Sequence, residues 1–192
     1  CTLVEDVCQD NLSRDDKEAL IDHISNLRFI PGGRYLYYAG RDKKFFNNCY
    51  LLRLEEDSRE EWAALSQRAM SCLMTGGGIG ADVSLCRPSG RQLRRTGGVA
   101  SGPIPLLHTL NEVGRNVMQG GSRRSALYGS MNWQHEDTNN LLTAKNWHDM
   151  KVGDTTLAAL KKAEFNFPAP LDMMNISLNY DDAWLHSTGR VN

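Results

Sequence analysis

The chain has 192 residues, of which 41% are hydrophobic and 23% are charged, and its formal net charge is −1. This composition is typical of a globular protein. It excludes a disordered tail or a polybasic arm, so we expect no nucleic-acid partner. No stretch approaches the roughly 20 apolar residues that a membrane helix needs, so we expect no membrane partner. The length allows one large domain.

The first residues and the cysteines bear on the origin of the chain. The N-terminus lacks the basic and apolar regions of a secretory signal and does not begin with Met. We therefore expect a fragment, for which truncation, a split gene and an intein are alternatives; Cys1 suits a post-intein junction. The five cysteines form no CxxC and no His-containing cluster at zinc spacing. This pattern suits a reducing cytoplasm, and we expect no metal site.

The predicted elements alternate along the chain. Ser13 begins the first helix as its N-cap with Asp16 as reciprocal partner, and Pro103 lies in the first turn of a later one. Apolar alternation predicts the strands, and in one of them Leu85 is expected to point inward. We expect helices within 13–30, 57–75, 103–118, 138–145 and 155–163, and strands at 35–38, 50–54, 79–85, 126–133 and 174–180. Such alternation predicts an α/β class with mostly parallel pairing.

Glycines concentrate between residues 76 and 129, at the junctions between predicted elements. Without a Cβ, backbone amides can approach a phosphate or a base closely, and arginine forks suit phosphate oxygens. The clusters are 76–80, 96–98, 101–103 and 119–124, and the arginines beside them are Arg87, Arg91, Arg94, Arg95, Arg123 and Arg124. One such cluster is more simply a tight turn with solvated arginines. Four of them together predict phosphate or nucleotide binding.

Two other motifs invite a chemical interpretation that their context weakens. Gly76 to Ala81 satisfy G-x-G-x-x-A, but that dinucleotide fingerprint follows a strand and opens a helix. Here the predicted order is helix and then strand, which excludes the Rossmann interpretation. His135-Glu136-Asp137 resembles a catalytic or metal trio, but adjacent residues do not share a face, and such a string commonly opens a helix.

Four stretches carry a resemblance to a known family. They are residues 31–41 followed by Asn47-Asn48-Cys49, residues 96–103, residues 119–126, and residues 165–168 with 175–177. Together they resemble the ribonucleotide reductase barrel, and most of all its adenosylcobalamin-dependent (class II) enzymes. The resemblance implies a ten-stranded α/β barrel. Residues 1–192 would then be one incomplete domain, with 1–30 as a helical lead-in and 31–192 as the first half of the barrel with its nucleotide-binding loops.

The resemblance also implies a reaction, namely the thiyl-radical reduction of ribonucleotides at the 2′ carbon for DNA precursor synthesis. In the family, two cysteines on barrel strands deliver the electrons and become a disulfide. Cys49 matches the first of these two. For a lone cysteine, a small buried hydrophobe is the simpler interpretation. The flanking resemblance favours the redox role for Cys49, and the other cysteines match no functional position.

Two nucleotide sites follow from the same resemblance. Substrate contacts fall on Gly33, Asn48, Cys49, Gly78, Gln119 and one of Arg123 or Arg124. A dNTP or ATP effector would place its ribose hydroxyl on Asp57 and its phosphates on Arg87, Arg94 and Arg95. The implied cofactor is adenosylcobalamin, bound mainly outside this chain. The implied partners are a dithiol reductant such as thioredoxin and the remaining part of the reductase chain.

Some family features do not occur in this sequence. The fingertip motif Asn-x-Cys-x-Glu, which holds the radical cysteine, is absent, so we expect the fragment alone to be inactive. A triphosphate substrate is favoured by analogy with monomeric class II enzymes, with a diphosphate as the alternative. A class I large subunit and a non-catalytic dNTP-sensing module remain alternative functions. Cys49 beside the substrate-side glycines argues against the sensor, which has no use for them.

Overall fold

The computed structural model describes residues 2–93, 97–117 and 125–188. They fall into two compact units, which meet in the sequence between Asn48 and Cys49. Residues 31–48, which we expected with the barrel, group with the helices before them. The N-terminal unit contains α1 (Thr2–Cys8), α2 (Arg14–Ser25) and α3 (Gly33–Tyr38).

One helix of the N-terminal unit begins at the predicted residue, whereas another was predicted as a strand. The Ser13 side chain accepts a hydrogen bond from the Asp16 amide at 3.1 Å, which confirms the predicted start of α2. The strand expected at residues 35–38 is wrong, because these residues form α3. A continuous apolar run does not by itself distinguish helix from strand. Here the Tyr35 ring stacks on Phe46 at 5.0 Å between centroids, and this local contact suits the helical turn.

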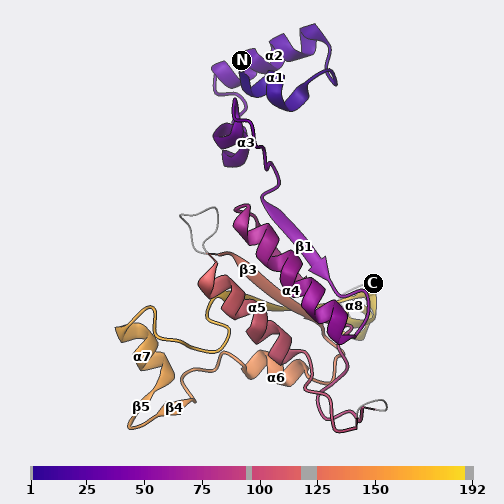
Figure 1. Ribbon diagram of the computed structural model, residues 1–192, viewed down its shortest axis with the longest axis vertical. Helices are drawn as coiled ribbons and strands as arrows, with labels where there is room; N and C mark the ends of the chain where they lie inside the picture. Colours follow the sequence, from indigo (N-terminus) through magenta and orange to yellow (C-terminus); the bar gives the residue numbers. More distant parts are fainter. Residues whose placement is uncertain (1, 94–96, 118–124, 189–192) are drawn as a thin grey trace. The chain divides into compact units, whose positions relative to one another are not determined.

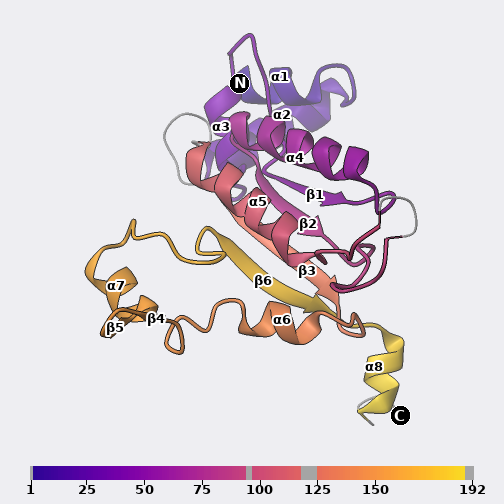
Figure 2. The ribbon, with the colours of Figure 1, turned by 60° about the horizontal axis from the view of Figure 1, so that its bottom comes forward.

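The C-terminal unit is built on a four-stranded parallel sheet in the order β1-β2-β3-β6 (Figure 2). Its strands are β1 (Cys49–Arg53), β2 (Gly78–Asp82), β3 (Leu127–Asn132) and β6 (Met174–Asn179). The remaining elements are α4 (Arg59–Met74), α5 (Ile104–Asn116), α6 (Thr138–Thr143), β4 (Lys151–Val152), β5 (Thr155–Thr156), α7 (Leu157–Ala163) and α8 (Asp182–Ser187). The prediction of an α/β class with parallel pairing is confirmed.

Helices α4 and α5 run side by side over one face of this sheet (Figure 1). Helix α4 begins where expected, with the Ser58 side chain accepting from the Glu61 amide at 3.1 Å. Its residues Leu65, Ala69 and Leu73 recur every four positions and are completely buried. Each buried leucine contributes roughly 2 kcal/mol of hydrophobic stabilisation, so this stripe holds the helix on the sheet.

Strand β2 confirms one prediction and contradicts another. It follows α4 directly, which confirms the helix-then-strand order that excluded a dinucleotide fingerprint. The alternating residues Ile79, Ala81 and Val83 are buried, but Leu85, which was predicted to point inward, is 59% exposed. The strand ends earlier than predicted because Asp82 accepts a hydrogen bond from the Ser84 amide at 3.0 Å and turns the chain.

No helix in the described part of the chain is long and apolar enough to cross a membrane.

Candidate active site and nucleotide-binding corner

The two faces of the parallel sheet carry different kinds of residue. Because side chains alternate along a strand, the face under α4 and α5 takes the buried apolar residues. The opposite face takes the intervening positions, where Leu51 is 76% and Tyr128 is 39% exposed. Near the start of the strands this opposite face presents Cys49, Leu51, Gly78, Gly80, Tyr128 and Asn175. We call it the open face.

Cys49 and Gly78 lie opposite each other on the open face. They are partners in the parallel register of β1 and β2. Both line a cavity of about 640 Å³, together with Tyr128 and the start of β6. Glycine suits this surface, since a Cβ at Gly80 would lie only 3.3 Å from the Tyr128 ring. The structure therefore brings together two of the predicted substrate-side residues and adds Tyr128, which the sequence analysis did not single out.

Cys49 differs chemically from the other cysteines of the C-terminal unit. It is an exposed free thiol, whereas Cys86 is buried. Burial, helped by the nearby Asp57 carboxylate, raises the pKa of Cys86 to about 12. Burial also raises the pKa of Cys72. A thiol must ionise to react as a nucleophile, so Cys86 and Cys72 are poorly reactive and Cys49 is the accessible thiol of this unit.

Asp57 and Arg87 form a second cluster, beyond the carboxyl ends of β1 and β2. Arg87 makes an ion pair through Nε with the Asp57 carboxylate. Its backbone N–H donates to the same carboxylate at 2.9 Å, and its Nη2 donates to the Asp57 carbonyl at 2.8 Å. The Trp62 indole donates to the other carboxylate oxygen at 3.2 Å. The Arg87 side chain nevertheless stays 45% exposed, and ligands of open α/β sheets bind at this end of the strands.

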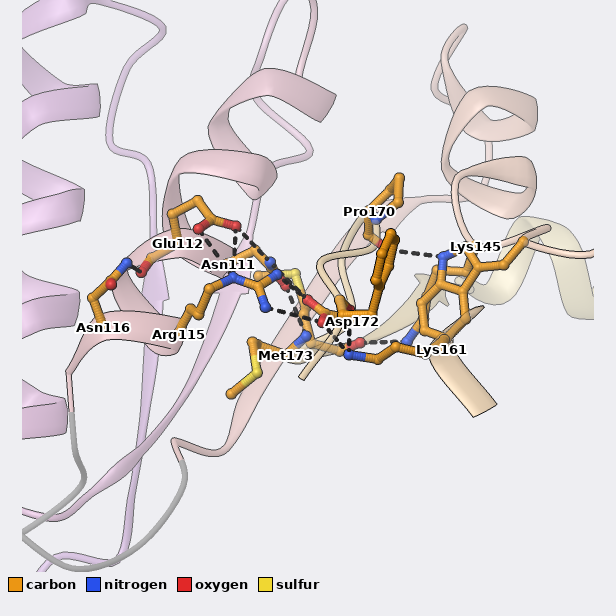
Figure 3. A network of polar contacts seen from close by, with 12 residues as sticks. Asn111, Glu112, Arg115, Asn116, Lys145, Lys161, Pro170, Asp172 and Met173 are labelled. Atoms are coloured by element: carbon orange, nitrogen blue, oxygen red, sulfur yellow. Dashed lines mark hydrogen bonds and ion pairs between the residues drawn. The ribbon is translucent and has the colours of Figure 1, made fainter. Parts of the chain in front are cut away.

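A buried polar network supports the cavity wall beside β6 (Figure 3). The Asp172 carboxylate, completely buried, accepts hydrogen bonds from Arg115 of α5, Asn111 of α5 and Lys161 of α7, the last at 2.6 Å. The Asn111 side chain in turn accepts from the Met173 amide at 2.9 Å. Asp172 also lines the cavity that contains Cys49. The network thus ties two helices to the turn that leads into β6.

Lys145 is a further cation at this wall. Its Nζ donates to the Met174 carbonyl at 2.7 Å, and it lines the cavity. Burial lowers the pKa of Lys145, although the Asp172 carboxylate partly opposes that effect. Neither Lys145 nor Asp172 was predicted as a site residue, because no local motif surrounds them.

Comparison with known proteins identifies the family. Residues 47–175 match the family model described as "Ribonucleotide reductase, barrel domain". The chain belongs to the ribonucleotide reductase barrel family. This match spans more than half of the chain and includes Cys49, Asp57, Gly78 and Arg87.

Individual proteins that are similar to the chain are ribonucleotide reductases as well. The chain is 30% identical, over 97% of its length, to a vitamin B12-dependent ribonucleoside-diphosphate reductase of Mycobacterium tuberculosis, and it covers 24% of that protein. It is 28% identical, over 61% of its length, to a ribonucleoside-diphosphate reductase large subunit of Arabidopsis thaliana, covering 15% of it. The chain thus spans about a quarter or less of these relatives. Its fold is similar to a class Id ribonucleotide reductase alpha subunit of Actinobacillus ureae, with a TM-score of 0.72, 15% identity, and coverage of 99% of this chain and 31% of that one.

The remaining predicted site residues of the reductase resemblance divide into two groups. Gly33 begins α3 and Asn48 ends the N-terminal unit, so both belong to the unit that precedes Cys49. The others, Arg94, Arg95, Gln119, Arg123 and Arg124, lie outside the described residues. Their assignment to substrate or effector stays a prediction.

Proposed function

We propose that the protein carrying this chain reduces ribonucleotides to deoxyribonucleotides, and that Cys49 is one of its two reducing cysteines. The observation that carries the proposal is the placement of Cys49. It is an exposed thiol that faces Gly78 across two parallel strands, in a cavity of about 640 Å³. That volume lies within the roughly 300–1,000 Å³ usual for small-molecule pockets. We propose the reaction itself from the family to which the chain belongs.

The proposed reaction balances with two thiols. The C2′–O bond of the ribonucleotide breaks and its oxygen leaves as water. Two electrons and two hydrogens are needed, one hydrogen for C2′ and one for the departing water, and they come from Cys49 and from a second cysteine that we place outside this sequence. The two sulfur atoms form a disulfide, which a dithiol reductant such as thioredoxin then reduces. Adenosylcobalamin, when bound, would supply the starting radical; we propose that it binds mainly outside this chain.

The cobalamin-dependent class is supported by two similar proteins, the vitamin B12-dependent reductases of Mycobacterium tuberculosis and Thermoplasma acidophilum. A class I enzyme remains the second candidate, because large subunits from Arabidopsis thaliana and Danio rerio also match. Relatives of both kinds are called diphosphate reductases, so we now propose a ribonucleoside diphosphate as substrate in place of the triphosphate favoured earlier. A non-catalytic sensor is disfavoured, since it needs no exposed thiol beside Gly78.

Three further assignments belong to the same proposal. Asp57 and Arg87 would form part of a site for a dNTP or ATP effector, supported by their contact beyond the carboxyl ends of β1 and β2. The chain would be part of one barrel domain with residues 1–30 as its lead-in. A cytoplasmic location is supported by the cysteines of the described residues, which are all free thiols.

Replacement of Cys49 by serine tests the proposal. In the complete polypeptide with adenosylcobalamin and dithiothreitol, Cys49→Ser should abolish repeated turnover of ribonucleoside diphosphates. Cys72→Ser, which removes a half-buried thiol of the same unit, should retain turnover. Undiminished turnover of the Cys49 variant would show that the thiol has no redox role. Omitting cobalamin and adding a radical-generating subunit separates the two enzyme classes.

A further inference from the structure

The segment 133–137 between β3 and α6, which contains His135-Glu136-Asp137, lies against the loop that carries Arg87. His135 Nε2 is 2.8 Å from the carbonyl oxygen of Cys86. The Asp137 carboxylate accepts a hydrogen bond from the Ser89 amide at 2.8 Å. These two contacts hold the backbone one residue before and two residues after Arg87.

The partners of His135 define which of its nitrogens carries the proton. The Cys86 carbonyl can only accept, so Nε2 must donate to it. The Asp137 amide donates to Nδ1 at 3.0 Å, so Nδ1 must accept. These two contacts together fit the tautomer of His135 that carries its proton on Nε2. His135 is a backbone-fixing side chain, which is a different role from that of a metal ligand or a general base.

Asp137 is held equally firmly. It is only 4% exposed, and its second carboxylate oxygen accepts from the Asn140 side chain at 2.7 Å. A Cβ at Gly102, where φ is +78°, would lie 2.8 Å from the Asp137 carboxylate and 2.8 Å from the Ser89 side chain. One of the predicted glycine clusters thus has a structural reason, since only glycine lets the two loops meet here.

Arg87 is held through both its side chain and its neighbouring backbone. Its guanidinium and its amide bind Asp57, while its flanking backbone is bound by His135 and Asp137. The loop that carries Arg87 is thus held by Asp57 of the β1–α4 loop on one side and by the β3–α6 segment on the other. We propose that His135 and Asp137 are positioning residues for Arg87, and that through it they set the affinity of the nucleotide-effector site. This inference rests on the proposed function.

Two amide substitutions separate positioning from general stability. In His135→Gln, the amide nitrogen can take the place of Nε2 and keep the bond to the Cys86 carbonyl. In His135→Asn, the side-chain oxygen can replace Nδ1 and keep the bond from the Asp137 amide, but the side chain does not reach Cys86. Glu136→Gln is the matched control, because it removes only the exposed ion pair to Arg91 between the same loops.

The variants are compared in the complete polypeptide by titration with each of the four dNTPs and by hydrogen exchange. His135→Asn should weaken dNTP affinity roughly tenfold, as expected for the loss of one hydrogen bond. It should also speed exchange of the Arg87 and Ser89 amides, both of which are hydrogen-bonded here. His135→Gln should restore both readouts, and Glu136→Gln should change affinity less than about twofold.

If His135→Asn leaves exchange at Arg87 and Ser89 unchanged, or if Gln and Asn lose affinity equally, the positioning role is wrong. If exchange responds as expected but Arg87→Ala binds every dNTP like the wild type, the effector role in the proposed function fails while the positioning contact stands. Should His135→Asn not fold, Asp137→Asn, which keeps a single acceptor oxygen, takes its place with the same expected exchange at Ser89.

Discussion

Replacing Asp172 by asparagine should destabilise the protein strongly while keeping the size of the side chain. The carboxylate is completely buried and is paired with Arg115 and Lys161, whose side chains are 24% and 15% exposed (Figure 3). Removing one partner of a buried ion pair leaves the other charges poorly solvated, at a cost of about 3–5 kcal/mol. Arg115 keeps its contact with Glu112, at 3.1 Å, so we expect the lower end, about 3 kcal/mol.

Urea unfolding followed by circular dichroism measures this difference. Glu18→Gln is the control, because it removes an ion pair to Arg14 whose side chains are 63% and 89% exposed. Such surface pairs contribute about 0.5 kcal/mol or less. An Asp172→Asn variant within about 1 kcal/mol of the wild type would refute the view that this network is a main support of the cavity wall.

The pH dependence of the same variant gives a second check. Burial alone would raise the pKa of Asp172, but hydrogen bonds from Lys161, Arg115 and Asn111 hold that pKa below its ordinary value. A carboxyl with a lowered folded-state pKa stabilises the protein above its unfolded pKa, about 3.9, and loses this contribution as the pH falls through the folded value. The stability gap between wild type and Asp172→Asn should therefore narrow below about pH 4. A gap that stays constant or widens there contradicts the assignment.

Two further predictions concern cysteine reactivity and the replacement of glycines by alanine. Iodoacetamide at about pH 8 should alkylate Cys49 in the folded protein and spare Cys86, whose pKa is raised to about 12. Peptide mass spectrometry measures the labelling of each cysteine, and equal labelling of the two would contradict the prediction. Gly129→Ala should cost about 1–3 kcal/mol in urea unfolding, because a Cβ there would lie 2.9 Å from Leu107. Gly33→Ala, with nothing within 4 Å, should change stability by less than about 0.5 kcal/mol, and equal effects of the two would be a refutation.

The sequence was informative wherever a signal is local. A helix was predicted within 57–75, and the structure has α4 there, begun by the Ser58 cap and buried along the four-residue spacing from Leu65 to Leu73. Alternation of helices and strands predicted the parallel pairing. The run at 35–38 was ambiguous, because a short apolar run shows neither the helical nor the strand periodicity clearly. In the structure it is helical, and its Tyr35 ring stacks on Phe46, which lies outside the run.

The site was predictable in part for the same reason. Cys49 stood in a stretch that resembles the reductase family, and Gly78 stood in the glycine cluster 76–80. The parallel register of β1 and β2 brings the two residues together. The Asp172 network could not be predicted, because its members come from α5, α7 and the turn before β6. No spacing rule connects residues that meet only after the helices have packed. The role of His135 was hidden likewise, since its partner is a backbone carbonyl 49 positions away.

The exposure of Cys49 depends on residues that face away from the open face. Side chains alternate strictly along a strand, so a slip of one residue in β1 would turn Cys49 toward α4. Its thiol would then be buried as Cys86 is, and burial raises the pKa of Cys86 to about 12. The register that prevents this pairs Tyr50 with Ile79 and Leu52 with Ala81 on the helix-covered face. Packing under α4 therefore keeps the thiol available for chemistry on the opposite side of the sheet.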